Sequence, residues 1–294
     1  MEDADLPAFV SGLGLPGLVD IHVHFMPERV LRKVWAYFDT VPPAHGMSWP
    51  VQYRQDEQER LAILRKLGVV AHPALVYPHK PGMAQWLNGW CREFRGAVPS
   101  GTFYPEPGVR EYVRAALDDG AWVFKSHLQV GDYDPTDPLL DEVWGMLAEA
   151  GAPVVCHCGG GPFPGRFTGP GPIGAVLARH PRLRLVVAHC GSPEYGDFLD
   201  LAARYPNVHL DTTMAFTDFL DRYAPFPADL LPRLLDLGDR VVLGSDFPNI
   251  PYPYAHQIDA LVRLGLGDAW LRGVLHDNGA RLIGDRPGGR HEIV

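Results

Sequence analysis

Short runs of apolar, β-branched residues alternate along the chain with longer segments in which apolar positions recur every three or four residues. The first pattern predicts strands and the second predicts amphipathic helices, such as Pro138–Ala150 and Glu194–Tyr205. Glycines such as Gly68 and Gly151 mark expected helix ends. The segments predicted as strands are Gly17–His24, Val69–Tyr77, Val98–Tyr104, Ala121–Leu128, Pro153–Cys158, Arg184–Cys190, Val208–Thr213 and Arg240–Asp246.

Eight strands, most of them followed by a helix, indicate an α/β fold of the (β/α)8 TIM-barrel type. A chain of 294 residues fits one such domain, with a core from about 17 to 284 and a tail from Asp285 outside it. The third strand is the weakest, because Pro99 and Gly101 interrupt it. An open, doubly wound sheet is the alternative. Pro42–Tyr53 and Gly159–Pro172 are predicted to be functional loops.

Polar residues gather where the predicted strands end. In the first strand, Asp20, His22 and His24 alternate with apolar residues and so share one face. Asp20 is either a ligand or a support behind the two histidines. Polar groups near a core cost free energy unless something binds them, and the C-terminal ends of barrel strands face the active-site mouth. The same pattern ends strands four, five, six and eight with Lys125, His127, His157, His189 and Asp246.

The cysteines are too few and too unevenly spaced for a disulfide framework. Two of them flank His157, and thiolates bind zinc well. Strand alternation, however, turns the neighbours of His157 toward the opposite face, where a thiol packs as a small apolar group. The same argument applies beside His189, so the metal site is predicted without Cys156, Cys158 and Cys190.

The charge balance narrows the class of partner. A formal net charge of −9 argues against nucleic acid or an anionic membrane as a partner. The N-terminal segment is acidic and contains Pro7 and Pro16, so it is not predicted to be a signal peptide. No apolar run approaches the ~18 residues of a membrane span. We expect a cytoplasmic protein that acts on a small molecule.

The ordered strand-end residues resemble those of the amidohydrolase superfamily. They are most similar to its amidohydrolase-related branch (amidohydrolase 2), which includes aminocarboxymuconate-semialdehyde decarboxylase. The resemblance covers nearly the whole chain, from Val19–His24 through Gly244–Pro248 to Asn278–Leu282. It implies a metal-dependent enzyme, and homodimers are common in the family, although no segment here identifies an interface.

The resemblance also implies a ligand set. The metal would be held by His22, His24, His157 and Asp246, with His189 beside it as a catalytic residue. One ion is usual in this branch, most commonly zinc, and manganese or iron also suit three imidazoles and a carboxylate. Other branches hold two ions bridged by a carbamylated lysine on strand four. Lys125 and His127 are therefore candidates for a second ion or for the substrate.

Two reactions fit such a site. In a hydrolase, a water whose pKa the ion lowers to about 7 attacks an ester, lactone or amide, Asp246 takes the proton, and His189 orients or polarises the substrate oxygen. In a decarboxylase, the same centre acts on an unsaturated or aromatic carboxylic acid. We favour hydrolysis, because no motif in the sequence identifies a cationic group that would bind a substrate carboxylate. A non-catalytic metal-binding barrel is the remaining alternative.

Substrate contacts are the least defined part of the prediction. His79 and Lys80 follow the second strand, where a charged pair suits an anionic substrate. Arg54 and Arg166 are candidates because they fall in predicted loops at the mouth of the barrel. Aromatic residues in the same regions either form a pocket wall or pack the loops onto the barrel: Trp49, Tyr53 and Trp86.

Overall fold

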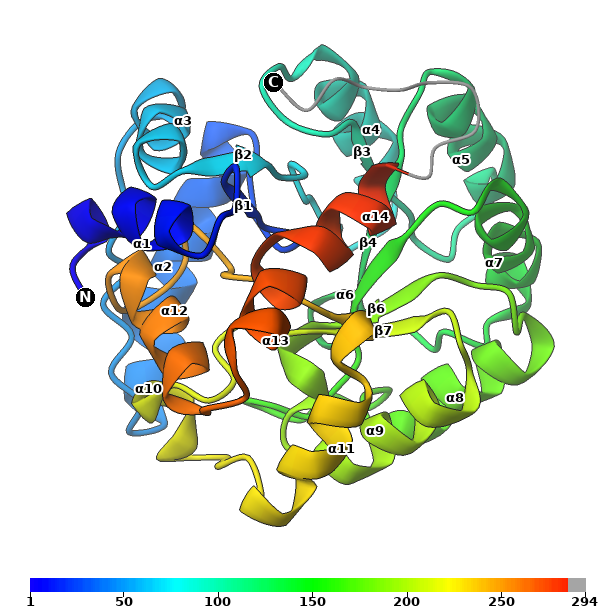
Figure 1. The fold of residues 1–294 in the computed structure, drawn as a ribbon. Coiled ribbons are helices and arrows are strands. Elements are labelled where there is room, and N and C mark those ends of the chain that lie inside the picture. The colour runs from blue at the N-terminus through cyan, green and yellow to red at the C-terminus, as the bar shows by residue number, and fades with distance from the viewer. Residues whose placement is uncertain (285–294) are drawn as a thin grey trace.

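All eight predicted strand segments pair in the computed structural model, which describes residues 1–284. Strands β3 to β8 form one parallel sheet in chain order, and β1 pairs with β2 in parallel. Figure 1 shows helices surrounding these central strands. The strands are β1 Leu18–Val19, β2 Val69–Ala71, β3 Ser100–Thr102, β4 Val123–His127, β5 Val154–His157, β6 Leu185–Val187, β7 Val208–Asp211 and β8 Val241–Val242.

Isolated backbone bridges close this arrangement into a ring. Pro73 pairs with Val98 between the segments of β2 and β3, and Val23 pairs with Phe247 between the segments of β1 and β8. An open, doubly wound sheet has no pairing between its first and last strands, so this alternative is wrong. The predicted TIM-barrel class is confirmed.

The third strand forms although its sequence is weak. A Cβ atom at Gly101 would lie 2.6 Å from the Phe124 ring, so glycine lets β3 approach β4 closely. The hydroxyl of Thr102 donates to the carbonyl of Lys125 (2.8 Å) and ties the same two strands together. The proline stands just before the strand, where it interrupts no ladder.

The helices follow the predicted amphipathic segments closely. In α7 the side chain of Asp137 caps the amide of Leu139, and Gly151 ends the helix with a φ of 67°. The helices are α1 Leu6–Gly12, α2 Glu28–Ala44, α3 Glu57–Lys66, α4 Ala84–Glu93, α5 Val109–Asp118, α6 Leu128–Gly131, α7 Pro138–Ala150, α8 Pro170–Arg179, α9 Tyr195–Arg204, α10 Asp218–Asp221, α11 Leu231–Asp236, α12 Tyr254–Arg263, α13 Asp268–Arg272 and α14 Asn278–Gly284.

Several details differ from the sequence prediction. Helix α2 continues to Ala44 and α8 begins at Pro170, so both predicted loops are shorter than expected. Strands β1, β6 and β8 end before their polar residues, which therefore lie in irregular backbone or a turn, whereas β4 and β5 keep His127 and His157 within the strand. All four cysteines are buried free thiols, as predicted. Within residues 1–284 no helix combines the length and apolar character needed to cross a membrane. The predicted tail from Asp285 lies outside the described residues.

Candidate metal centre and active site

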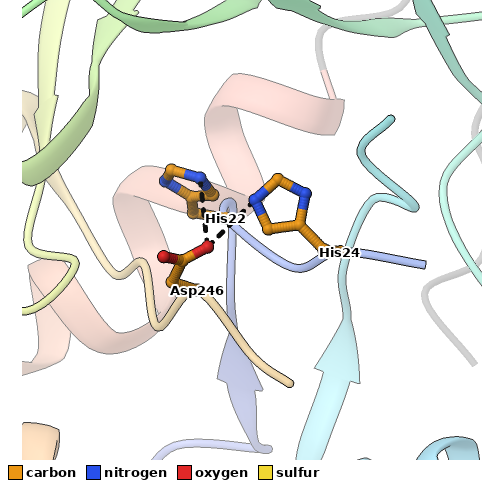
Figure 2. A group of neighbouring side chains, drawn as sticks. All are labelled: His22, His24 and Asp246. Atoms are coloured by element: carbon orange, nitrogen blue, oxygen red, sulfur yellow. Dashed lines mark ion pairs between the residues drawn. The ribbon is translucent and has the colours of Figure 1, made fainter. Parts of the chain in front are cut away.

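Three predicted ligands converge at one end of the barrel. The ligand atoms of His22, His24 and Asp246 lie within 4.8 Å of one another. Figure 2 shows both imidazoles, from the segment after β1, pointing toward the carboxylate that follows β8. Oδ1 of Asp246 lies 2.9 Å from Nε2 of His24 and 3.8 Å from Nε2 of His22. Asp246 thus shares one small volume with histidines that lie 222 and 224 positions earlier in the sequence.

Hydrogen bonds fix which nitrogen of each imidazole faces this point. Nδ1 of His24 donates to the carbonyl of Leu75 (3.0 Å), and Nδ1 of His22 donates to the carboxylate of Asp211 (2.9 Å). In the neutral rings both Nε2 atoms therefore carry lone pairs. Two imidazole lone pairs and the Asp246 carboxylate face one another, and such a set of acceptors needs a proton or a cation between them. The donor set fits a divalent metal ion.

His157 adds an unpartnered nitrogen beside this group. Its Nε2 is buried without a hydrogen-bond partner, a costly state for a polar atom unless a ligand satisfies it. The ring stacks on His127 with centroids 4.2 Å apart and meets His189 edge-on at 4.9 Å. Burial lowers the pKa of His157 well below its ordinary value, which keeps the ring in the neutral form that binds metals.

His189 and Asp246 both stand on left-handed backbone. Their φ angles are 57° and 69°, in a region that residues with side chains rarely occupy. His189 lies in a single tight turn after β6, Ala188–Gly191. Asp246 follows Gly244, where an added Cβ would lie 2.9 Å from the Cβ of His22. The close approach and the unusual turns aim both side chains into the site, and such strain is typical of functional residues.

The hydrogen bonds of His189 define its proton state. Its Nδ1 donates to the carbonyl of Thr213 (3.1 Å), so Nε2 of the neutral ring is an acceptor. Burial lowers the pKa of His189, which favours this neutral form. For Asp246, burial acts to raise the pKa, but a hydrogen bond from protonated His24 and positive charge on the nearby histidines outweigh it and hold the pKa well below its usual range. The site thus contains two proton acceptors.

Lys125 reaches the same point from β4. Its Nζ donates to Nε2 of His22 at 3.1 Å, and its side chain is fully buried. Burial, followed by the charge of Lys125, lowers the pKa of His22 to about 4. An ion that takes the Nε2 lone pair would displace the amine from it. Burial lowers the pKa of Lys125, while the charges of Asp211 and Asp246 act to raise it. Among the described residues, Lys125 is the one buried lysine next to the ligands.

His127 is brought to the site with a different tautomer. Its Nδ1 accepts a hydrogen bond from the amide of Val130 (3.3 Å), so Nε2 of the neutral ring carries the proton. This arrangement suits a donor to a substrate better than a metal ligand. The strand register pairs His127 with His157 and Ser126 with Cys156, so the thiol lies on the opposite face, as predicted.

Asp20 lies behind the site and supports it. Its carboxylate accepts hydrogen bonds from the hydroxyls of Ser245 (2.5 Å) and Tyr254 (2.8 Å) and from the amides of His22 and Ser245. Burial raises its pKa to about 7, although these hydrogen bonds act to lower it. Asp20 thus joins the segment after β1 to the one after β8, and its two oxygens are engaged away from the ligand cluster.

The site forms the floor of a cavity of about 810 Å³. His79 and Lys80 line this cavity, as do Trp49 and Trp86. Tyr53 does not, because its hydroxyl donates to Asp3 and its ring packs on Phe247. The cavity is large enough for a small organic molecule beside the ligand cluster.

Comparison with known proteins identifies the family. A model of the amidohydrolase family matches residues 19–284. The chain belongs to the amidohydrolase family, a family of enzymes. The resemblance expected from the strand-end residues is therefore confirmed. No protein in a curated set matches this amidohydrolase significantly.

Solved structures share the barrel with this amidohydrolase at low sequence identity. An uncharacterized TIM-barrel protein from Bordetella bronchiseptica is 18% identical with a TM-score of 0.71, covering 91% of this chain and 99% of the other. A 2,6-dihydroxybenzoate decarboxylase, solved with 2,6-dihydroxybenzoate, is 16% identical with a TM-score of 0.61, covering 92% and 99%. A Pseudomonas putida protein with a proposed 2-pyrone-4,6-dicarboxylic acid hydrolase activity is 14% identical with a TM-score of 0.58, covering 92% and 98%. These likenesses show the fold alone.

Two predicted substrate contacts lie elsewhere in the amidohydrolase. Arg54 forms an ion pair with Asp39 on the surface, and Arg166 lies over the ring of Phe167 at 5.0 Å. Neither arginine belongs to the described residues that line the cavity. The loop assignment was too coarse to place these side chains, because a loop residue next to the mouth can point to either side.

Sequence reasoning missed Asp211 at the end of β7. This fully buried carboxylate accepts hydrogen bonds from Nδ1 of His22 (2.9 Å) and from the amides of His189 (2.9 Å) and Thr213 (3.0 Å). It therefore fixes the tautomer of one candidate ligand and the turn that carries His189. The sequence did contain an indication of this role, because β7 has buried Val208 and Leu210 and ends on a carboxylate, as β8 does in its own segment.

We expect Asp211→Asn to weaken metal binding by about 10- to 100-fold, since an amide cannot serve all three donors as the carboxylate does. Competition with a chelator of known affinity measures the change. Asp236→Asn, at an exposed position of α11, is the matched control. Unchanged affinity in Asp211→Asn would show that the orientation of His22 does not matter for the ion.

Proposed function

We propose that this amidohydrolase is a metal-dependent hydrolase that acts on an ester, lactone or amide. The observation that carries the proposal is the meeting of two imidazole lone pairs and the Asp246 carboxylate on the floor of a cavity. The groups around it are those that hydrolysis requires, namely a proton acceptor and a cationic partner for a developing oxyanion.

His22, His24, His157 and Asp246 would hold one divalent ion, for which zinc is our assignment from the donor set. When bound, such an ion supplies Lewis acidity and a nucleophile at neutral pH. The orphaned nitrogen of His157 supports its place in this set. We assign His189 to a catalytic role beside the ion, as the family resemblance implies, and its ring is oriented by the hydrogen bond to Thr213.

Different side chains of the site would accept and donate the protons of the reaction. Nε2 of His189 accepts a proton, since its Nδ1 proton is committed to Thr213. This role differs from the polarising role expected from the sequence, which requires a proton on Nε2. Lys125 is the better group for polarising a substrate oxygen, because it is a buried donor next to the ligands. His127 donates to the substrate through its Nε2 proton.

A decarboxylase acting on an unsaturated or aromatic carboxylic acid is the second candidate. Lys125 favours it, because a buried cation beside the ligands can hold a reacting carboxylate. The decarboxylase among the structural neighbours shares the barrel, which makes the reaction compatible with this scaffold.

Elemental analysis of the purified protein, followed by turnover assays on lactones, esters, amides and unsaturated or aromatic carboxylic acids, tests the proposal. We expect about one divalent ion per chain and release of a carboxylic acid from a neutral substrate. Release of carbon dioxide from an acid substrate would replace hydrolysis by decarboxylation. A folded protein that binds the metal but turns over nothing in the panel would support the non-catalytic metal-binding alternative, and one that binds no metal would overturn the proposal.

A further inference from the structure

The charge of the cavity is opposite to that of the protein. The chain carries a formal net charge of −9, yet the described residues that line the cavity include four cationic side chains and a single carboxylate, Asp246. One of the four is Lys125 in the site. The others gather with a histidine in what we call the cationic rim: Arg29, Lys33, His79 and Lys80.

Two elements bring the cationic rim together. Arg29 and Lys33 lie one turn apart on α2, and His79 and Lys80 lie in the loop after β2. Partial burial, then the charges of Lys80 and Lys33, lower the pKa of His79, so both elements act on the same point. Two residues before His79, the ring of Tyr77 lies 5.4 Å from that of His24. The rim and the candidate metal centre therefore line the same cavity.

The positive charges of the rim have no carboxylate partners. Within residues 1–284, none of Arg29, Lys33 and Lys80 forms an ion pair, whereas the neighbouring Arg32 pairs with Glu28 at 3.0 Å. Arg29 instead lies over the ring of Trp86, 4.3 Å from its centroid, which orients the guanidinium without neutralising it. Unpaired lysines are common on surfaces, but these cations share one cavity whose described lining residues include a single carboxylate.

The same helix adds an apolar wall next to these charges. Val30, Val34 and Phe38 recur every four residues along α2 and line the cavity, so α2 presents an apolar stripe beside the stripe of Arg29 and Lys33. A ligand that satisfies both stripes has an apolar body and an anionic group.

We propose that the cationic rim binds the carboxylate or phosphate group of an amphipathic anionic substrate, whose apolar body lies along α2 and whose reacting carbonyl lies at His22, His24 and Asp246. The position of the reacting carbonyl rests on the proposed function, and the anion site does not. A cationic cluster at the mouth of a cavity also attracts anions from solution and so speeds their binding.

The test measures binding of three probes that share one apolar body: 4-phenylbutyrate, 4-phenylbutyl phosphate and the neutral 4-phenylbutanamide. The metal-loaded protein is titrated by calorimetry, together with the double variant Lys33→Met, Lys80→Met. Lys66→Met, at an exposed position of α3, is the matched control. Each exposed charge contributes up to about fivefold, so we expect the double variant to lose about tenfold in affinity for the anions and nothing for the amide. Lys66→Met should leave all three affinities unchanged.

A carboxylate probe can also bind the metal itself, so the titrations are repeated after the metal is removed. If the protein still binds the anions more tightly than the amide without metal, and the double variant does not, the result supports anion binding at the cationic rim. Anion preference that the double variant retains, or that disappears with the metal, overturns it, as does equal binding of the anions and the amide. The ratio between the two anions identifies the preferred group. If the protein hydrolyses nothing but binds the anions through the rim, the proposed function fails and the anion site stands.

Discussion

His22→Ala and His157→Ala are each expected to remove the bound metal and to reduce turnover by about 10³-fold or more. The Lewis acidity of such an ion contributes several kcal/mol to the stabilisation of the transition state, and each 1.36 kcal/mol corresponds to a factor of ten in rate. His22 has its Nε2 lone pair aimed at Asp246, and Nε2 of His157 is buried without another partner. Nε2 of His157 has no protein partner among the described residues, and Nε2 of His22 has only the amine of Lys125, which a metal ion would displace.

Metal content measured by mass spectrometry and steady-state turnover, on the same protein samples, check this expectation. His180→Ala is the matched control, because that imidazole pairs with Asp141 at the surface and lies outside the cavity. Loss of His22 also removes a hydrogen bond from each of Asp211 and Lys125, so circular dichroism and thermal unfolding must accompany the assay. Full metal occupancy in either folded variant would remove that histidine from the ligand set.

The sequence allowed the barrel and the centre of its site to be predicted for a common physical reason. A polar residue that ends an apolar strand is placed near the core at a cost, so it marks a position where something compensates for that cost. His22, His24 and Asp246 meet as this reasoning requires. The register of β4 and β5, which pairs His127 with His157, also follows the alternation of side chains along strands.

The supporting residues were harder to predict, because their roles depend on backbone that leaves the strand. β1 ends at Val19, and the alternation that placed Asp20 beside the histidines fails there, so its carboxylate bonds to Ser245 and Tyr254 instead. Asp211 follows the strand-end pattern, yet its importance depends on three donors that only the fold brings together.

The residues that line the cavity were even harder to predict from the sequence. Arg29 and Lys33 face the cavity because α2 crosses its mouth, and nothing in the local sequence reports where a helix docks. Arg54 lies close to them in the chain but pairs with Asp39 on the surface. Local pattern therefore identifies which residues are able to bind a ligand, and tertiary packing decides which of them do so.

His189→Ala is expected to keep the metal and to lose about 10²- to 10⁴-fold in turnover, the range that a positioned general base contributes. Asp211 and Thr213 hold this residue through its amide and its Nδ1, so the lone pair of its Nε2 is available to accept a proton. The wild-type protein should lose activity as the pH falls through the pKa of His189, which burial places below its ordinary value of 6.5.

The variant should lack this acidic limb, because the group that titrates there is gone. Turnover as a function of pH, with metal content measured in parallel, distinguishes the roles open to His189. Retained metal together with a flattened acidic limb identifies it as the proton acceptor. Loss of the ion would make His189 a ligand and would require a different base, for which Asp246 is the remaining candidate. Unchanged turnover would leave its strained backbone, at a φ of 57°, without a catalytic explanation.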